Sequence, residues 1–311
     1  QLGQRDTTLT VRLQARSFYL DEVTVVAQEQ RVGSSSVIGK AAMVHVQPTS
    51  LADVLQLVPG QLSVNPNLVT AQQVMLRQVP STPDAARANA LGTAIIQDGV
   101  PVSNNANLQT DVTILNAPAG ALPPFSSVAG RGLDLRQIGA DNIESVEVVR
   151  GIPSARYGDL TSGLVLVNSR IGAFRPEMRI RANPNAVQGA FLVGFKAGSR
   201  GGTLNANVDI VRSQADPRDV LNRFTRLNGQ LAWQKNWGTE KKFGTTTILS
   251  GYRTLDERRQ SPDDRQLQRR NYASDQGFKF STEGKWQATR PWLNRLRYIV
   301  SATYSVQEAF F

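Results

Sequence analysis

The sequence of 311 residues contains no cysteine and a single histidine, His45. The lack of cysteine excludes disulfide bonds and thiolate metal sites, but it leaves the compartment open because many exported bacterial proteins also lack cysteine. One histidine is too few for the usual zinc clusters or for a histidine-based triad. We therefore interpret His45, in the stretch MVHVQP, as a strand or cap residue, and we expect no metal site.

Long apolar runs are also missing. No run approaches the roughly 18 residues that a transmembrane helix needs, and LVLV at Leu164–Val167 is typical of the longest ones. No basic and apolar leader follows Gln1. We expect either that a leader has been removed or that the sequence starts inside a larger protein.

The sequence does not match the motifs of common enzymes. Gly39-Lys40 is followed by alanine and has Ser34 where a phosphate-binding loop needs its first glycine. The two carboxylates of Asp263 and Asp264 are adjacent in a polar stretch, where they need not converge on one substrate. The sequence therefore predicts a protein that is not an enzyme and has no cofactor.

The net charge is +10 and the isoelectric point is near 10.3, which would permit binding to nucleic acid or to an acidic surface. The arginines are scattered, however, and the densest stretch, Arg253 to Gln276, interleaves acids with bases. No aromatic-studded basic strand resembles a single-strand binding platform. We interpret residues 253–276 as a solvated loop and expect no nucleic-acid partner.

A compact domain is predicted from about Gln47. In QPTSLADVLQLVPG, Ser50 is a helix N-cap with Asp53 at the third helical position, close to a capping box. Short strand candidates follow at residues 72–79, 92–102 and 143–151, and Asp98-Gly99 predicts a tight turn within the second. In the third candidate, Ile143, Val146 and Val148 predict a mostly buried strand, and Glu144 and Glu147 are expected to project outward.

The stretch SVEVVRGIPSARYGDLTSGLVLVNSR, Ser145 to Arg170, carries the most specific motif. It resembles the plug-domain signature of TonB-dependent outer-membrane receptors, and LADVLQLVPG and IIQDGVPV are similar to earlier motifs of the same plug. Ile152 is inserted before Pro153, and Ser162 stands where a glycine is common, which are mild departures. The resemblance implies an α+β plug domain inside a transmembrane antiparallel β-barrel, with the plug at residues 47–172.

The same resemblance gives the N-terminal residues a meaning. The stretch DEVTVVA resembles a TonB box, and its residues are Asp21, Glu22, Val23, Thr24, Val25, Val26 and Ala27. β-Branched residues favour an extended chain, which a partner's sheet binds by strand addition. The alternative is a terminal strand of the preceding domain. Residues 1–20 resemble the end of a carboxypeptidase-regulatory-like β-sandwich extension, and residues 21–46 would be the box and a linker.

Beyond Arg170 the apolar pattern changes to a period of two. In TLNANVDIV, for example, Leu204 and Val208 alternate with Asn205, Asn207 and Asp209. About seven strands are predicted in residues 173–311, with short connections at one rim and longer ones at the other, as in outer-membrane barrels. The aromatic residues at the membrane interface, or alternatively in ordinary packing, would be Trp237, Trp286, Trp292 and Tyr304. Seven strands cannot enclose a plug in a barrel of roughly 22 strands, so we expect a partial barrel.

The resemblance further implies active import of a nutrient ligand, such as a siderophore, haem, glycan or peptide, across the bacterial outer membrane. The partners would be TonB, outer-membrane lipid, the unknown nutrient and a surface lipoprotein. The plug–barrel interface would include Arg77, Arg150, Glu144 and Glu147, and ligand contacts would include Asn104, Asn105 and Asn107.

Two other functions stay open at this point. One is a plugged passive pore or surface-assembly scaffold without energised transport, and the other is a soluble β-rich adhesin. A soluble sandwich also alternates apolar and polar residues along its strands, so the pattern alone does not separate the second from a barrel.

Overall fold

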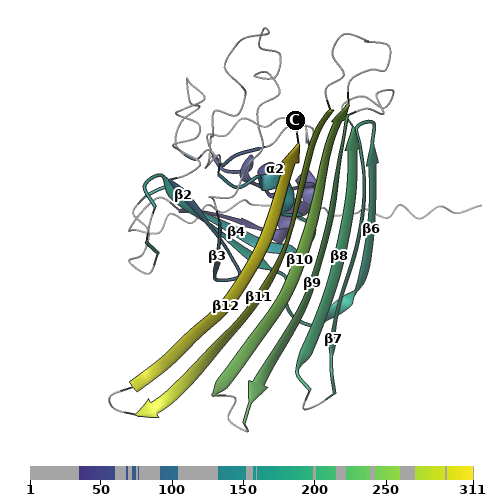
Figure 1. Ribbon diagram of the computed structural model, residues 1–311. Coiled ribbons are helices and arrows are strands. Elements are labelled where there is room, and N and C mark those ends of the chain that lie inside the picture. The colour runs from purple at the N-terminus through teal and green to yellow at the C-terminus, as the bar shows by residue number, and fades with distance from the viewer. Residues whose placement is uncertain are drawn as a thin grey trace, which may run out of the picture.

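The structure is a computed structural model (Figure 1). It describes residues 35–59, 68, 72–74, 76, 92–103, 132–151, 157–158, 160–198, 201–214, 222–238, 242–259, 270–290 and 293–310. Several predicted features lie outside the described residues: the expected sandwich end at residues 1–20, the box Asp21–Ala27, Arg77, and Asn104, Asn105 and Asn107.

The N-terminal domain is a five-stranded sheet in the order β1-β4-β5-β2-β3. Its strands are β1 (Ser35–Gly39), β2 (Thr93–Gln97), β3 (Val100–Val102), β4 (Ile143–Val149) and β5 (Gly163–Ser169). All neighbours are antiparallel except β2 and β5, which are parallel. Asp98 and Gly99 form the two-residue turn between β2 and β3 with positive φ angles of 54° and 80°, so the predicted tight turn is confirmed.

Two short helices and one 3-10 turn cover this sheet: α1 (Lys40–Val46), α2 (Leu51–Leu55) and η1 (Leu135–Gln137). The apolar side chains of α2, with Ile38, Met43 and the buried residues of β4 and β5, form one hydrophobic core. Ser50 and Asp53 make the capping box that the sequence predicts. The Asp53 carboxylate accepts hydrogen bonds from the backbone amides of Thr49 and Ser50, both at 2.9 Å.

Two local predictions for this domain are wrong. Residues 35–46, expected in a linker, form β1 and α1, because β1 pairs with β4 along its whole length and buries Ile38. Composition shows neither the pairing nor the burial. In the expected strand at residues 72–79, the described residues 72–74 and 76 lie in no strand, although Val74 and Leu76 are buried in the core.

The C-terminal part is one antiparallel sheet of seven strands in simple sequence order, as predicted. We call it the wall. Its strands are β6 (Phe174–Asn183), β7 (Ala186–Lys196), β8 (Thr203–Gln214), β9 (Asn222–Trp237), β10 (Phe243–Arg259), β11 (Arg270–Arg290) and β12 (Leu293–Phe310). No helix in the described ranges is long and apolar enough to span a membrane.

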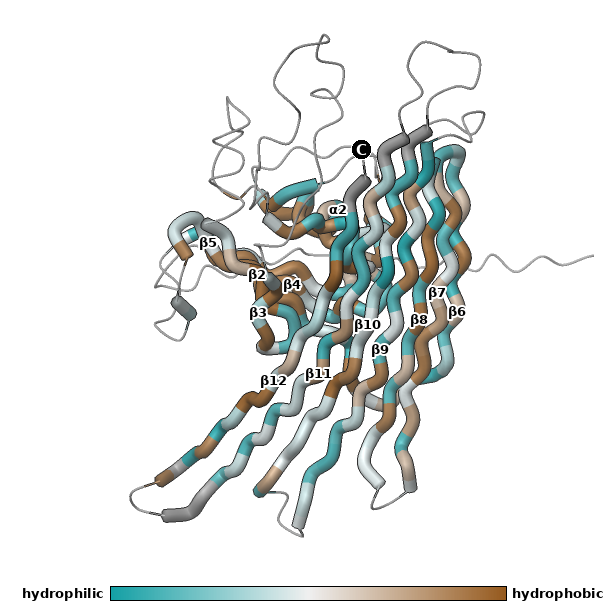
Figure 2. Tube along the Cα trace, viewed as in Figure 1, coloured by the Kyte–Doolittle hydropathy of each residue, from teal (hydrophilic) through white to brown (hydrophobic). Residues whose placement is uncertain are grey.

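The wall has one apolar and one polar face, and the alternation is visible along its long strands (Figure 2). The apolar side chains point away from the N-terminal domain and are exposed, as at Leu231, Leu249 and Phe278. The polar side chains point toward that domain, which lies against one face of the tall, curved wall (Figure 1). In a soluble sandwich the apolar faces would pack on each other, whereas this apolar face is exposed in the described residues, which argues against the adhesin alternative.

Much of the stretch from Arg253 to Gln276 lies in strands. Strand β10 continues to Arg259 and β11 starts at Arg270, with pairing unbroken from Arg253↔Gln276 to Arg259↔Arg270. The predicted solvated loop is wrong for these paired residues, because the backbone hydrogen bonds between neighbouring strands do not depend on apolar side chains.

Replacement of Asp53 by alanine tests the capping box. Without the carboxylate, the buried amides of Thr49 and Ser50 lose their acceptor, which costs about 1–3 kcal/mol. We expect faster hydrogen exchange at these two amides, with partial rescue in Asp53→Asn because the side-chain amide oxygen still accepts. Unchanged protection in Asp53→Ala would contradict the role of the carboxylate.

Candidate functional site: the interface between the N-terminal domain and the wall

The N-terminal domain contacts the polar face of the wall through two regions. The first is the segment that contains η1 and the residues after it, 134–142, together with the residues before α2. The second is the tip of the β2–β3 hairpin. The first region lies next to α2, and the second joins β2 to β3. The position of each contact region therefore depends on the fold of the N-terminal domain.

Arg226 on β9 reaches from the wall into the N-terminal domain. Its side chain is fully buried, and it forms an ion pair with Asp209 on the neighbouring strand at 2.8 Å. Its guanidinium also donates to the backbone carbonyls of Thr49, at 2.9 Å, and Arg136, at 2.8 Å. The Arg226 side chain thus binds two segments of the N-terminal domain at once, the residues before α2 and those of η1.

Arg136 in η1 makes the reciprocal contact. It is also fully buried and pairs with Asp134 of its own segment and with Asp256 on β10, at 2.7 and 2.9 Å. It donates to the carbonyl of Leu68 at 2.8 Å, and its guanidinium lies 4.4 Å from the ring centre of Phe224 on β9. Arg136 therefore joins two segments of the N-terminal domain, its own and that of Leu68, to strands β9 and β10 of the wall.

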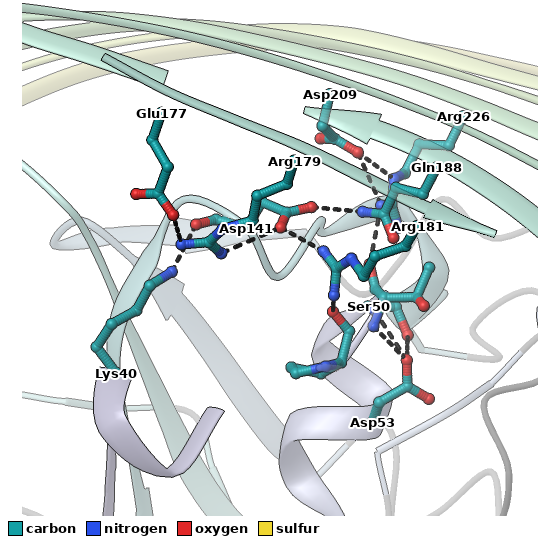
Figure 3. A network of polar contacts seen from close by, with 12 residues as sticks. Lys40, Ser50, Asp53, Asp141, Glu177, Arg179, Arg181, Gln188, Asp209 and Arg226 are labelled. Carbon is teal, nitrogen blue, oxygen red and sulfur yellow. Dashed lines mark hydrogen bonds and ion pairs between the residues drawn. The ribbon is translucent and has the colours of Figure 1, made fainter. Parts of the chain in front are cut away.

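Asp141 is the centre of a third cluster (Figure 3). Its carboxylate, 3% exposed, contacts Arg179 at 3.3 Å and also Arg181 and Gln188, all on the first two wall strands. Arg181 donates in addition to the carbonyl of Pro48 at 2.8 Å. The cluster binds the start of the wall to the loop that precedes α2.

The buried position of this cluster changes the acidity of two groups in the N-terminal domain. Burial, together with the positive charge of Arg179, lowers the pKa of Lys40 to about 8. Burial raises the pKa of Asp141, against the opposing effect of Arg181. Lys40 nevertheless keeps a direct contact, because its amino group donates to the Asp141 carbonyl at 2.7 Å.

Neutral amides and one lysine complete the interface. Gln137 donates to Asp275 on β11, and Asn142 donates to Gln230 on β9. At the hairpin tip, Lys279 on β11 lies 3.4 Å from the carbonyl of Gln97. These contacts extend the polar interface across the wall from β6 to β11.

Gly139 allows the closest approach between the two parts. A Cβ at this position would lie 2.6 Å from an Asp209 carboxylate oxygen, 3.0 Å from the Asn228 amide and 3.1 Å from the Arg226 guanidinium. Glycine is the residue that leaves room here for the wall side chains that bind the neighbouring carbonyls.

Three of the sequence-predicted interface residues lie in the described ranges. Arg150 donates to the carbonyl of Pro59 at 2.9 Å and to the Ser36 hydroxyl at 3.5 Å, both within the N-terminal domain. Glu144 is exposed and Glu147 half-buried on β4, so both project from the core as expected. Their proposed contact with the wall, like that of Arg150, stays a prediction.

Sequence reasoning missed the residues that make the described contacts, namely Arg136, Asp141, Arg179, Arg181 and Arg226. A usable signal was present. The sequence shows that apolar and polar residues alternate along these strands, and Arg226 and Asp209 occupy polar positions. A charged residue at a polar position is expected on the face of the wall that contacts the N-terminal domain. Among the described residues, no group of three or more His, Cys, Asp or Glu side chains is arranged to hold a metal ion.

The variant Gly139→Ala tests the close approach, with Gly39→Ala as a matched control. The added methyl group would push against Asp209 and Arg226, and such overpacking typically costs about 1–3 kcal/mol. Gly39 has a φ of −89° and no atom within 4 Å of an added Cβ, so its variant should be neutral. We expect faster hydrogen exchange at the amides of Leu51 and Ala140 in Gly139→Ala alone; equal exchange in both variants would contradict the prediction.

Residues 27–165 match the family described as TonB-dependent Receptor Plug Domain. The match begins before the predicted plug start at residue 47, in agreement with the pairing of β1 in the N-terminal sheet and the packing of α1 next to it. The sandwich extension expected for residues 1–20 lies outside the match and stays a prediction. No curated protein matches the sequence with significant similarity.

Solved structures share the fold at low sequence identity. The siderophore receptor PiuA from Acinetobacter baumannii is 14% identical with a TM-score of 0.58, over 89% of this chain and 37% of that one. The ferric yersiniabactin uptake receptor FyuA from Yersinia pestis is 15% identical with a TM-score of 0.57, over 90% and 42%. The siderophore receptor PirA from Pseudomonas aeruginosa is 15% identical with a TM-score of 0.53, over 91% and 42%.

The chain spans about two-fifths of the length of these structures. Its N-terminal domain is a TonB-dependent receptor plug domain, and its wall has the fold of part of the barrel of such a receptor.

Proposed function

We propose that the protein imports a nutrient ligand across the bacterial outer membrane, with energy delivered through TonB. The observation that carries this proposal is a plug domain bound to the polar face of a wall whose other face is apolar and exposed. A protein built in this way separates two aqueous compartments and closes the passage between them with a separate domain.

The apolar face has the dimensions of a membrane-spanning surface. On β9, the outward residues between Arg223 and Lys235 are uncharged, and they include Leu227, Leu231 and Trp233. That span is about 40 Å along the strand, or about 30 Å across a bilayer at the usual tilt. Two charged outward residues limit this band near its Arg223 end: Arg212 is the cross-strand partner of Thr225, and Arg253 is the cross-strand partner of Leu227. The uncharged band is therefore shorter on β10 than on β9.

The plug–wall interface is suited to reversible release because it is polar. Arg226, Arg136 and Asp141 make hydrogen bonds and ion pairs that water can replace once the plug moves. Interfaces of this composition resemble those of transient complexes more than domain cores. The plug can then be closed at rest and displaced under force.

The partner that applies the force would bind Asp21–Ala27 by strand addition, and the segment between this box and β1 would transmit the pull. Import driven in this way takes its energy from the inner membrane, so the protein itself needs no nucleotide site and no enzymatic activity. β1 is an edge strand of the plug sheet and the first described element along the line of force.

The nutrient is proposed only by class. Siderophore, haem, glycan and peptide importers share this architecture, and the receptors named above bind or take up siderophores. Asn104, Asn105 and Asn107 follow β3 and are proposed as ligand contacts. Arg77, Arg150, Glu144 and Glu147 are proposed to bind the barrel, and a surface lipoprotein is a proposed partner for glycan or peptide capture.

Proline substitutions in the box test the energised step. Val25→Pro and Val26→Pro each remove a backbone donor, and one of these two neighbours must face the partner strand. We expect that at least one of them weakens binding to the purified periplasmic domain of TonB by tenfold or more in calorimetry. The matched control Gln30→Pro lies beyond the box and should bind normally.

A growth experiment with the host distinguishes active import from a passive pore or assembly scaffold. Cells are supplied with ferric siderophores, haem, oligosaccharides or peptides as the sole source of iron or carbon, and the nutrient that requires the protein is identified. The box variant should abolish growth on that nutrient. A passive pore or assembly scaffold would support unchanged growth despite the lost TonB binding.

A reversible crosslink tests whether the plug must move. Because the chain has no native cysteine, Asn142→Cys and Gln230→Cys introduce two unique thiols whose native side chains are in contact. Bridging them with a reducible bis-thiosulfonate should stop uptake of the identified nutrient, and dithiothreitol should restore it. Each single-cysteine variant treated with the same reagent is the control, and undiminished uptake by the bridged protein would refute plug displacement.

A further inference from the structure

The outward face of β9 ends in two tryptophans with a lysine between them. Trp233, Lys235 and Trp237 alternate along the strand and therefore share one face, which is the face that carries Leu227 and Leu231. The indole rings are 5.9 Å apart and nearly perpendicular. The Lys235 amino group lies 3.7 Å from the ring centre of Trp237 and 5.9 Å from that of Trp233.

The two indoles are held by hydrogen bonds to neighbouring strands and turns. The Trp233 ring N–H donates to the carbonyl of Gly201 at 2.9 Å, and the Trp237 ring N–H donates to the Thr245 hydroxyl at 2.8 Å. Both donors are thus used within the protein. The rings form a fixed aromatic frame around the ammonium group of Lys235 rather than two freely rotating side chains.

Lys235 differs from two other cations at this end of the wall, Lys285 and Arg297. Lys285 and Arg297 both pair with Glu283, at 3.1 and 2.6 Å, and they occupy the inward positions of β11 and β12. Within the described part of the chain, Lys235 makes no ion pair with a carboxylate. Among the described residues, it is an outward-facing positive charge without a carboxylate partner.

The surface next to this frame is apolar. Leu204 is the cross-strand partner of Trp233, and Leu231 is that of Leu249, and all three leucines are exposed. If Lys235 binds a charged head group, the hydrocarbon chain attached to that head group can therefore lie on the adjacent apolar surface. Aromatic residues with one polar end are favoured at that boundary.

We propose that Trp233, Lys235 and Trp237 bind the phosphate of a membrane phospholipid, whose acyl chains lie over Leu204, Leu231 and Leu249. This site rests on the proposed location of the wall in a bilayer. The ammonium group donates to a phosphodiester oxygen while the indole faces contact the glycerol region. A ligand for this site needs both an anionic oxygen for Lys235 and an apolar chain for the leucines. A free anion lacks the apolar chain, and a neutral lipid lacks the anionic oxygen.

The experiment has two stages, so that a failure of the site differs from a failure of the membrane location. First, the full-length protein is mixed with phosphatidylglycerol vesicles and floated on a density gradient, where it should rise with the lipid. A protein that stays at the bottom would overturn the bilayer location itself and the site with it.

Second, delipidated protein in detergent is titrated with phosphatidylglycerol and with diacylglycerol of the same acyl chains, and bound lipid is counted by native mass spectrometry. Phosphatidylglycerol should bind the wild type at least tenfold more tightly than diacylglycerol. Lys235→Gln should lose about tenfold of that affinity, because a charge-assisted hydrogen bond is removed. Lys235→Arg should retain it, and Lys285→Gln, which alters an inward and paired lysine, should be unchanged.

In this second stage, two results would overturn the proposed phospholipid site. One is equal phosphatidylglycerol binding by the wild type and Lys235→Gln. The other is complete displacement of phosphatidylglycerol by inorganic phosphate at millimolar concentration, which would identify the site as one for a free anion. Persistence of the lipid in the presence of inorganic phosphate supports the site.

Discussion

Two buried arginines, one from each part of the molecule, set the relation between the plug and the wall. Arg226 and Arg136 keep their charge under all ordinary conditions, so full burial requires acceptors for their donors. Each arginine finds these acceptors partly on the opposite part, at backbone carbonyls for Arg226 and at Asp256 for Arg136. Separation without water would leave a buried charge unpaired at a cost of about 3–5 kcal/mol.

This requirement explains the local sequence around η1. Arg136 needs Asp134 two residues earlier as an internal counter-charge, and Gly139 must be small for Asp209 and Arg226 to come close. Asp141 then meets the arginines at the start of the wall. The polar residues of this segment form the contact surface for the wall, while Leu135, Ile138 and Ala140 belong to the core of their own domain.

The fold was predictable to the extent that it depends on periodicity and local chemistry. The period of two predicted the wall, and Ser50 with Asp53 predicted the start of α2, because in both cases the signal lies within a few residues. The strand β1 and the interface residues were not predictable in this way. Ile38 is buried by β4, which is more than a hundred residues distant, and Arg226 looks like any polar residue of a strand until the carbonyls of Thr49 and Arg136 are placed beside it.

The two faces of the wall respond differently to force. With the wall in a bilayer as proposed, moving the outward leucines of β9 into water would expose apolar surface at roughly 25 cal/mol per Å². Each wall strand also holds its neighbours by a ladder of backbone hydrogen bonds. The inward contacts of Arg226 and Asp141 are with groups that water can satisfy in turn. A pull on the plug therefore meets less resistance at its polar interface than the wall presents to rearrangement. In the function proposed above, the period-two alternation of the strands that predicts the sheet thus also determines which part of the molecule moves.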